Sequence, residues 1–449
     1  MPATGNTAAR GKRKILITAL LLIGLMLGLA ACRGFFGQAP IALLTYTPLT
    51  DEEVPVTVNF DISGSTDPDG NIASYELDYG DGSTHATGTD VTDALSHTYT
   101  DSGAFTVTLT VTDGDGRIGM DTATVAIGPA MLTYASDHDG DYDIWRMVAD
   151  GTGAAAVLNT TNDELFPDLI KGTRDTIAYA AEGSAWNIWK VAVTGGIATQ
   201  LTTQTDSNQI QPSWSHDGSK IAYASNADTT QTPSDTTWDI WTMTASGTSQ
   251  QVLIDQTPSW AIAPMYSPVS NDLLFVSNMS NTGGGTAIWK WNGTTATQLY
   301  PSTTTHADHY GDASSGVTVS TPLNLPAGAG ISRPAWSPDG TKIAFSTNKD
   351  AGVINIYVMD ADASTTPKTL EDYVDAEYGV TNTDITTADP EFSPYWLEDG
   401  SGIVFARDDG STVNLYKVLF VASGSNPVGT VVQLTNSTTH NNTMPAAKR

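Results

Sequence analysis

The chain has 449 residues, which is enough for two or three domains, and its 20 basic and 49 acidic residues give a formal net charge of −29. Nucleic-acid binding requires a basic surface, so this charge argues against a nucleic-acid partner. An excess of acidic residues together with abundant Thr, Ser, Asn and Asp is instead typical of a soluble, exported, β-rich protein.

The N-terminal segment has the three parts of an export signal. Basic residues at Arg10–Lys14 precede the apolar run Ile15–Leu29, and small residues follow immediately before Cys32, the only cysteine of the chain. The apolar run is shorter than the roughly 20 residues that a membrane-spanning helix needs. The pattern therefore predicts a signal peptide over residues 1–31.

This segment resembles the signal of bacterial lipoproteins, in which a cysteine after small residues becomes the lipid-modified first residue of the mature protein. The resemblance implies that Cys32 is acylated, that residues 32–38 form a lipidated tether, and that the lipid bilayer is a partner. Arg33, in place of Asp, implies sorting within the cell envelope to the outer membrane, on its periplasmic or surface face. The alternative is an ordinary secretory signal with an incidental cysteine.

Residues 39–128 have the pattern of a separate β-sandwich. In Phe105–Thr112 apolar residues alternate with threonine, which is the period of a half-buried strand. All eleven tryptophans lie at or beyond Trp145. This change in composition predicts a domain boundary at Gly128-Pro129-Ala130, with a second domain over residues 129–449.

The sandwich segment resembles a PKD (polycystic-kidney-disease type) Ig-like domain. Leu77 stands where that family usually has Trp, which implies a smaller core at this position. Such domains act as spacers or adhesion modules, and some of them bind calcium. The resemblance rests on Phe60-Asp61-x-Ser63-Gly64-Ser65-x-Asp67-x-Asp69-Gly70, Tyr75, Asp78-Tyr79-Gly80-Asp81-Gly82 and His97-x-Tyr99-x-x-x-Gly103-x-Phe105.

Residues 129–449 consist of a unit that occurs six times. In its clearest copy, Arg333–Asp360, a Pro-x-Trp strand ends in a Ser-Pro-Asp-Gly turn, and Ile343–Phe345 and Ile356–Met359 form the next two strands. A fourth strand with a leucine follows each copy. Four strands per unit, repeated at roughly 45 to 70 residues, predict the blades of a β-propeller.

The first copy begins at its second strand, Leu132, without the Pro-x-Trp strand that precedes it in other copies. The missing strand matches Asn442–Ala447 near the C-terminus. Because their pairing would bury edges that an open array exposes, we expect six blades closed by the C-terminal strand. The expected fold class is therefore all-β, an Ig-like PKD β-sandwich followed by a six-bladed β-propeller.

The unit also resembles the WD-like repeat of TolB-type propellers. The resemblance covers Met131 to Arg449 and implies the propeller fold, whereas propellers of this kind serve as binding platforms, scaffolds and occasionally enzymes. The segment Asp163–Ala180 departs from the pattern because it lacks Trp. The residues that carry the resemblance are Pro334-x-Trp336-Ser337-Pro338-Asp339-Gly340, Ile343-Ala344-Phe345 and Ile356-Tyr357-x-Met359.

Acidic turns are the first candidate metal sites, because calcium binds hard oxygen ligands on a bent backbone. The alternative is that these aspartates accept backbone N–H bonds as ordinary turn residues. The calcium candidates are Asp67 and Asp69 in the PKD-like segment and Asp137, Asp139, Asp141 and Asp143 in the first propeller copy.

A second candidate metal site is the pair His306 and His309, with neighbouring aspartates, in the long insertion Pro301–Ser332. Two histidines at this spacing converge on a metal when they lie on a helix, and the insertion has no helix signal. A solvated loop is therefore the alternative for this segment.

Antiparallel strands place the second-to-third loops and the connectors between blades on one face of a propeller, and here these are the long loops. Function usually resides on long loops held by a rigid scaffold, so we expect the binding face there. No catalytic residue is assigned, because the sequence has no Gly-x-Ser-x-Gly elbow and no available cysteine nucleophile. The candidate contacts are Trp186, Trp238, Trp260, His306, His309, Tyr310, Tyr373 and Tyr378.

Two functions remain open from the sequence. The favoured one is a non-catalytic, envelope-anchored lipoprotein whose propeller binds a protein or a polysaccharide, with the PKD domain as a spacer or adhesion module. The alternative is a metal-assisted polysaccharide lyase or hydrolase that acts through His306 and His309 on the long-loop face, since some TolB-like propellers resemble such lyases.

Overall fold

The structure is a computed structural model of the chain, which divides into two compact units. The all-β class predicted from the sequence is confirmed, since strands dominate both units. The structure describes residues 37–47, 52–53, 56–100, 103–128, 130–170, 176–227, 237–255, 258–279, 286–300, 333–347, 353–380, 385, 389–398, 400–420 and 427–447.

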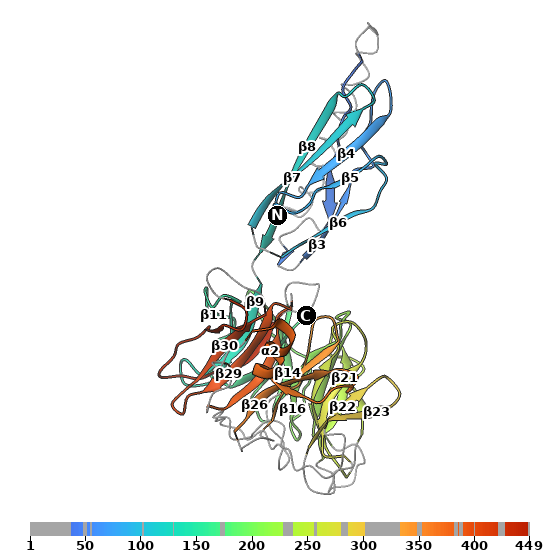
Figure 1. Cartoon of the computed structure of the whole chain (residues 1–449). Coiled ribbons are helices and arrows are strands. Elements are labelled where there is room, and N and C mark those ends of the chain that lie inside the picture. Colours follow the sequence, from blue (N-terminus) through green and yellow to red (C-terminus); the bar gives the residue numbers. More distant parts are fainter. Residues whose placement is uncertain are drawn as a thin grey trace, which may run out of the picture. The chain divides into compact units, whose positions relative to one another are not determined.

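The first eight strands form the N-terminal sandwich (Figure 1). One sheet has the order β1-β3-β6 and the other has the order β2-β8-β7-β4-β5. The alternation predicted for the long strand is present, because Val107, Leu109 and Val111 of β7 are fully buried, and the buried Leu77 of β4 lies directly opposite Leu109 in the ladder. The bounds are β1 (Thr45–Thr47), β2 (Glu52–Glu53), β3 (Val56–Asp61), β4 (Ile72–Asp78), β5 (Ala86–Gly88), β6 (Leu95–Tyr99), β7 (Gly103–Asp113) and β8 (Ile118–Gly128).

The remaining strands form six four-stranded sheets, which we call the six-sheet unit. Each sheet is antiparallel, and its strands follow one another in sequence except that β32 joins the first sheet. In sheet order, the bounds are β32 (Asn442–Ala447), β9 (Met131–Ser136), β10 (Asp143–Val148) and β11 (Ala155–Ala156); β12 (Glu164–Leu169), β13 (Thr176–Ala181), β14 (Asn187–Ala192) and β15 (Thr199–Gln200); β16 (Gln209–Trp214), β17 (Lys220–Ser225), β18 (Asp239–Thr244) and β19 (Gln251–Ile254); β20 (Ala261–Tyr266), β21 (Leu273–Ser277), β22 (Ala287–Trp291) and β23 (Ala296–Tyr300); β24 (Ala335–Trp336), β25 (Lys342–Thr347), β26 (Asn355–Asp360) and β27 (Lys368–Thr369); β28 (Glu391–Trp396), β29 (Gly402–Asp408), β30 (Val413–Leu419) and β31 (Val431–Gln433).

The second and third strands of most sheets are joined by an aromatic pair directly across the ladder. Tyr223 of β17 lies opposite Trp241 of β18, with ring centroids 6.5 Å apart, and Phe345 of β25 lies opposite Tyr357 of β26 at 6.0 Å. Directly opposed aromatic pairs stabilise antiparallel sheets by about 0.2–1 kcal/mol each. The recurring aromatic residues are therefore packing residues of the sheets.

In five of the six sheets, the first strand contains a proline and has a one-residue bulge at that position. The residue before each of these prolines has a left-handed φ between 52° and 58°, which is uncommon outside glycine. The ladder register shifts at the same point in each strand, so two residues face one on the partner strand. The five residues are Phe166, Gln211, Ala263, Ser393 and Met444.

Neighbouring sheets are joined through these first strands. Gln211 Oε1 accepts a hydrogen bond from Ala263 N at 2.8 Å, and Asp168 Oδ2 accepts one from Trp214 N at 2.7 Å. The buried Arg333 guanidinium donates to the carbonyl oxygens of Pro167 at 2.9 Å and Pro212 at 2.7 Å, although these prolines lie in two other sheets. Arg333, which stands two residues before β24, is thus bonded to the first strands of both the second and the third sheets.

The connector after β27 contains the helix α2 (Leu370–Tyr378), where the sequence predicted only a long loop (Figure 1). Thr369 caps its N-terminus by accepting Asp372 N at 3.1 Å, and Gly379 ends it with a φ of 66°. The helix buries Leu370, Tyr373 and Val374 in a core cluster shared with strands β24 to β26 and β28 to β30. The loop prediction was wrong because the Thr-x-x-Asp cap and the terminal Gly were overlooked as helix signals.

Across the part of the chain that the structure describes, every helix is too short or too polar to cross a membrane.

Candidate functional site

A groove opens between the sheet β20–β23 and the sheet β24–β27 of the six-sheet unit. Its volume is about 610 Å³, and its walls come from the turns β20–β21, β24–β25 and β26–β27. These are the short turns, on the face that the sequence argument did not choose. The lining residues are Ser267, Val269, Ser270, Asp272, Lys290, Trp336, Gly340, Thr341, Asp360, Ala361, Asp362 and Ser364.

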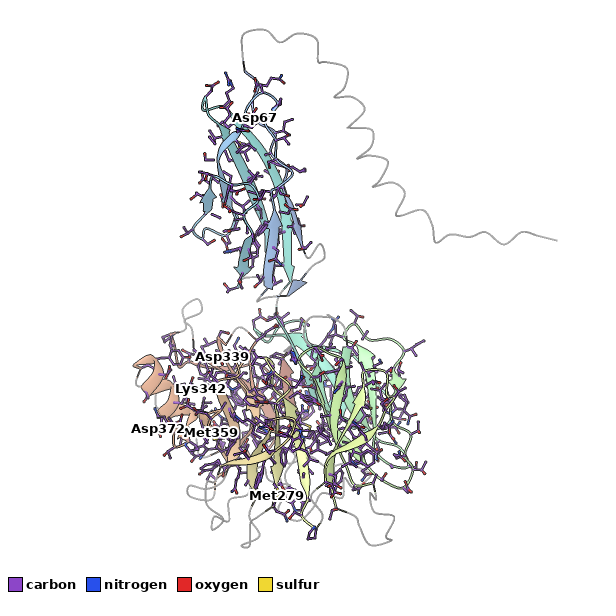
Figure 2. The ribbon with its side chains drawn as sticks, turned by 90° about the vertical axis from the view of Figure 1, so that its right-hand side faces the viewer. Asp67, Met279, Asp339, Lys342, Met359 and Asp372 are labelled. Carbon is purple, nitrogen blue, oxygen red and sulfur yellow. The ribbon has the colours of Figure 1, made fainter. Side chains whose placement is uncertain are left out.

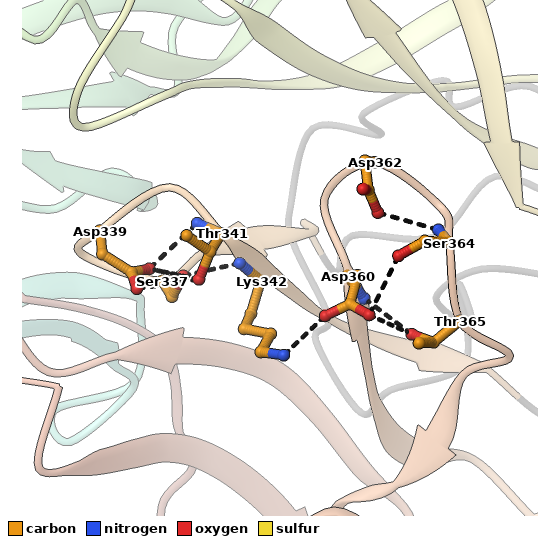
Figure 3. Close-up of polar contacts among 8 residues, drawn as sticks. All are labelled: Ser337, Asp339, Thr341, Lys342, Asp360, Asp362, Ser364 and Thr365. Atoms are coloured by element: carbon orange, nitrogen blue, oxygen red, sulfur yellow. Dashed lines mark hydrogen bonds and ion pairs between the residues drawn. The ribbon is translucent and has the colours of Figure 1, made fainter.

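The β24–β25 turn is held by its own side chains. Asp339 Oδ1 accepts Thr341 N at 3.0 Å and the Ser337 hydroxyl at 2.5 Å, and Ser337 Oγ in turn accepts Lys342 N at 2.8 Å (Figure 3). Such Asp–Ser/Thr contacts replace backbone hydrogen bonds in tight turns. The prediction that Asp339 is a turn residue agrees with this geometry, and the turn presents Gly340 and Thr341 to the groove.

An ion pair connects this turn with the opposite wall. Lys342 Nζ lies 2.6 Å from Asp360 Oδ1, and Thr365 Oγ1 donates to Asp360 Oδ2 at 2.7 Å (Figure 3). Lys342 and Asp360 are directly opposite in the β25–β26 ladder. Figure 2 shows Asp339 and Lys342 on the same part of the six-sheet unit. Across the sheet junction, Lys290 Nζ donates to Ala361 O at 3.2 Å and Trp336 Nε1 donates to Met265 O at 3.0 Å.

The groove carries an excess of negative charge. Hydrogen bonding to Lys342 lowers the pKa of Asp360, and hydrogen bonds from Ser364 lower the pKa of Asp362, so both are ionised at neutral pH. The same contact with Asp360 raises the pKa of Lys342. The lining then contains three aspartates and one lysine, Lys290. A ligand with cationic or hydroxyl groups suits this surface.

The structure corrects the prediction that certain aromatic residues are exposed contacts. The side chains of Trp186, Trp238 and Trp260 are only 0%, 2% and 6% exposed, and all three belong to the large core cluster of the six-sheet unit. They are buried because each indole packs between sheets beside the start of a strand. Tyr373 lies on the buried face of α2, and Tyr378, at 38% exposure, is on the surface. His306, His309, Tyr310 and Cys32 lie outside the described residues.

Among the described residues, no group of three or more His, Cys, Asp or Glu side chains is placed to hold a metal ion. The first-copy candidates have other partners: both oxygens of Asp137 accept from Asn441, and Asp139 Oδ2 accepts Asn159 Nδ2 at 2.6 Å. In the sandwich, Asp67 Oδ1 accepts Asp69 N at 3.3 Å in a turn at one end (Figure 2). This geometry favours the turn interpretation of the aspartates over calcium sites.

Asp143, another calcium candidate, instead forms a pair with Glu164 where the first two sheets of the six-sheet unit meet. Thr160 donates to both carboxylates, from N to Asp143 Oδ1 at 2.9 Å and from Oγ1 to Glu164 Oε1 at 2.8 Å. Both side chains are buried, and Asp143 Oδ2 and Glu164 Oε2 have no hydrogen-bond partner. Burial raises the pKa of both, and the nearby Asp143 raises that of Glu164 further. The pair therefore retains a proton well above the usual carboxyl range.

Sequence reasoning missed both the groove and this pair. Asp360, Asp362, Lys290 and Glu164 were not among the candidate residues predicted from the sequence. One signal was available for Lys290, because lysine also follows the Ile-Trp or Leu-Tyr pair at Lys190 and Lys417. Lys190 and Lys417 each donate to a backbone carbonyl of the next sheet, so a lysine at this position of the repeat indicates a contact between neighbouring sheets.

A family model matches the N-terminal part of the chain. The family model described as PKD domain matches residues 38–127. Collagenase ColA from Clostridium perfringens is 31% identical over 116 residues, which is 25% of this chain and 10% of that protein. The chain thus matches about a tenth of the length of this curated relative.

Solved structures add the fold of the remainder. TolB from Acinetobacter baumannii aligns with a TM-score of 0.50 at 16% identity, covering 78% of this chain and 81% of that one. Hydrazine synthase from Kuenenia stuttgartiensis aligns with a TM-score of 0.50 at 13% identity, covering 71% and 47%. An oligogalacturonate lyase from Vibrio parahaemolyticus reaches a TM-score of 0.40 at 11% identity, covering 89% and 86%, which is too low to support an argument. Residues 38–127 therefore match the PKD domain, and the fold of this all-β chain is similar to that of TolB-like β-propeller proteins.

Proposed function

We propose that this protein is a non-catalytic, envelope-anchored lipoprotein whose six-sheet unit binds a partner while its PKD domain serves as a spacer or adhesion module. The observation that carries the proposal is the acidic groove of about 610 Å³ on a rigid β scaffold, in a chain whose residues 38–127 match a PKD domain. Fixed ionised side chains on a rigid scaffold suit recognition of a ligand.

The six sheets are proposed to be the six blades of a propeller closed by the C-terminal strand. Pairing of β32 with β9 supports closure, as do the contacts of β32 with β12 on one side and β28 on the other. Hydrogen bonds from three lysines to backbone carbonyls support closure as well. Lys190 joins the second sheet to the third, and Lys290 joins the fourth to the fifth. Lys417 Nζ joins the sixth sheet to the first by donating to Ala149 O at 2.6 Å. The last junction repeats the pattern of the other two.

The partner is proposed to be a protein segment with lysine or arginine side chains, with a polysaccharide as the second class. Asp272 and Asp362 line the groove, and Asp360 is already paired with Lys342. A basic segment would neutralise Asp272 and Asp362, which form no ion pair among the described residues, whereas a neutral glycan would use the serine and threonine hydroxyls. The charge excess favours the protein segment.

The test is capture of partners from the native envelope by the purified chain. The double variant Asp272→Asn/Asp362→Asn should reduce capture several-fold and make the remaining capture less sensitive to salt. The amide oxygen introduced by Asp362→Asn would still accept the Ser364 N–H, so the turn should persist. The control Asp115→Asn/Asp90→Asn makes the same charge change in the N-terminal sandwich. Equal capture by both double variants would exclude the groove as the binding site.

The lipid anchor is tested at Cys32. Replacing Cys32 with Ser removes the thiol that would be acylated, so the chain should escape processing as a lipoprotein and any otherwise-cleaved product should leave the membrane fraction. Partition into detergent phase, compared with the parent chain, measures this. A processed Cys32→Ser chain that partitions as the parent does would contradict the anchor.

The lyase or hydrolase alternative depends on His306 and His309, and nothing in the described residues favours it. Metal content of the purified chain and activity on acidic polysaccharides remain its direct tests.

A further inference from the structure

Two histidines from opposite ends of the six-sheet unit lie against each other. His138 is in the β9–β10 loop, and His440 stands two residues before β32. Their Nδ1 atoms are 3.4 Å apart, and their rings are nearly perpendicular, at 89°, with centroids separated by 4.6 Å. Both rings are at least partly accessible to solvent. The pair therefore joins the beginning and the end of the unit at the seam where β32 meets β9.

The backbone on either side of the pair is fixed. Asp137 precedes His138 and Asn441 follows His440, and these two neighbours are joined by hydrogen bonds. Asn441 N and Nδ2 donate to the Asp137 carboxylate, the latter at 2.9 Å, and Asp137 N donates to Asn441 O at 3.2 Å. Asn441 Oδ1 also accepts Val413 N at 2.9 Å. The imidazoles are thus held opposite each other in advance of any ligand.

The separation of the two nitrogens matches that of two ligands on one metal ion. Two nitrogens at 2.0–2.1 Å from a tetrahedral zinc ion lie about 3.3–3.4 Å apart. By contrast, 3.4 Å is long for a hydrogen bond from an N–H donor, for which about 2.7–3.2 Å is usual. Imidazole nitrogen is a preferred ligand of zinc, copper and nickel.

We propose that His138 and His440 form a two-histidine site for a divalent transition metal ion, with zinc as the fitting ion and water completing its coordination. This site is separate from the groove and does not depend on the proposed function. The two ligands are 302 positions apart and come together only in the folded chain, so the ion binds the folded state alone. Its binding therefore stabilises the attachment of β32 to the first sheet.

The experiment measures thermal unfolding of the full chain in detergent, without a histidine tag, followed by tryptophan fluorescence. All eleven tryptophans lie at or beyond Trp145, so the signal reports on the six-sheet unit. Zinc chloride in excess should raise the melting temperature by about 2–4 °C, and EDTA should reverse the change. An unchanged melting temperature in the parent chain would overturn the proposal.

Variants locate the site. His138→Asn and His440→Asn should each remove the zinc-dependent shift, whereas the double variant His306→Asn/His309→Asn should retain it. If the shift survives in both single variants, or is lost in the insertion variant while the seam histidines are intact, the ion binds elsewhere and the proposal is wrong.

Quenching of tryptophan fluorescence by Cu²⁺ in the parent chain tests the site even if the histidine variants do not fold. The Trp145 ring lies 5.2 Å from the His138 ring, so bound Cu²⁺ should quench Trp145 fluorescence. The decrease in intensity on adding Cu²⁺ should be saturable and should be smaller in Trp145→Phe than in the parent. An identical decrease in Trp145→Phe would place the metal away from the seam and overturn the proposal.

Discussion

Asp143 shows how one atom changes the behaviour of a repeated position. In the second sheet the equivalent residue before the Ile-Trp pair is Asn187, whose Nδ2 donates to Gln204 O at 2.9 Å and whose Oδ1 accepts Gln204 N at 2.9 Å. Asp143 accepts Thr160 N in the same way, but its Oδ2 cannot donate unless it carries a proton. The buried pair with Glu164 is therefore the pH-sensitive point of this junction.

Replacing Asp143 with Asn should reduce that sensitivity, and the part that remains comes from the buried Glu164. Burial raises the pKa of Asp143, so the stability contributed by its protonated form is complete below the unfolded-state pKa of about 3.9 and is lost as the pH rises through the raised folded-state pKa. At pH 8 the Asp143→Asn chain should be more stable than the parent by about 1–3 kcal/mol, the usual cost of an unpaired buried polar group. Denaturant unfolding at pH 4 to 8 measures the difference.

The matched control is the reverse exchange, Asn187→Asp, which should create a loss of stability with rising pH at the next junction. A parent chain whose unfolding free energy is flat from pH 4 to 8, apart from effects shared by both variants, would contradict the assignment of a retained proton to the pair.

At the scale of elements, helix α2 depends on its caps because it has only nine residues. Thr369→Ala removes the acceptor of Asp372 N and should lower stability by about 0.5–2 kcal/mol, while Thr369→Ser should retain most of it. The difference between these two variants in melting temperature is the measurement. Equal values would mean that burial of Leu370, Tyr373 and Val374 holds the helix without its cap.

Strand β32 is the element on which closure depends. It pairs with β9 and buries Met444, Ala446 and Ala447. A handful of ladder hydrogen bonds at about 0.5–1.5 kcal/mol each and a buried methionine at about 1.5–3 kcal/mol come to roughly 5 kcal/mol. A chain ending at Thr439 should therefore melt much lower and be poorly soluble, with the edge of β9 exposed.

The control for this truncation is a chain ending at Ala447, which keeps β32 and should melt with the parent. A melting temperature for the shorter chain within a degree or two of the parent would exclude closure by the C-terminal strand, and the six-blade ring with it.

At the scale of the whole molecule, the PKD domain and the six-sheet unit are expected to fold independently. No tryptophan precedes Trp145, so tryptophan fluorescence follows the six-sheet unit alone. Removing residues 39–128 should leave that unfolding transition within about 2 °C of the parent, because each domain has its own core. A large decrease in the melting temperature would instead show that the two parts share stabilising contacts.

Much of the fold was predictable because its signals are local. Alternating apolar residues, aromatic residues in short runs and Asp-Gly turns are patterns of a few consecutive positions. They predicted strands such as β7, β17 and β25 without any information on which strands these would pair with. The helix α2 was equally local and was missed, although Thr369 and Gly379 mark its ends. The repeat period and the strand left over at Asn442–Ala447 predicted which distant strands would pair.

The sequence by itself thus determined the all-β class, the PKD-like segment and the period of the repeated sheets, because each is written in the spacing of neighbouring residues. Only the tertiary structure decided that Trp186, Trp238 and Trp260 are buried and that a groove lies between the fourth and fifth sheets. It alone brought Asp143 to Glu164 and His138 to His440. Those arrangements depend on how whole sheets pack against one another, and a contact between side chains on different sheets leaves no mark in the local pattern of either.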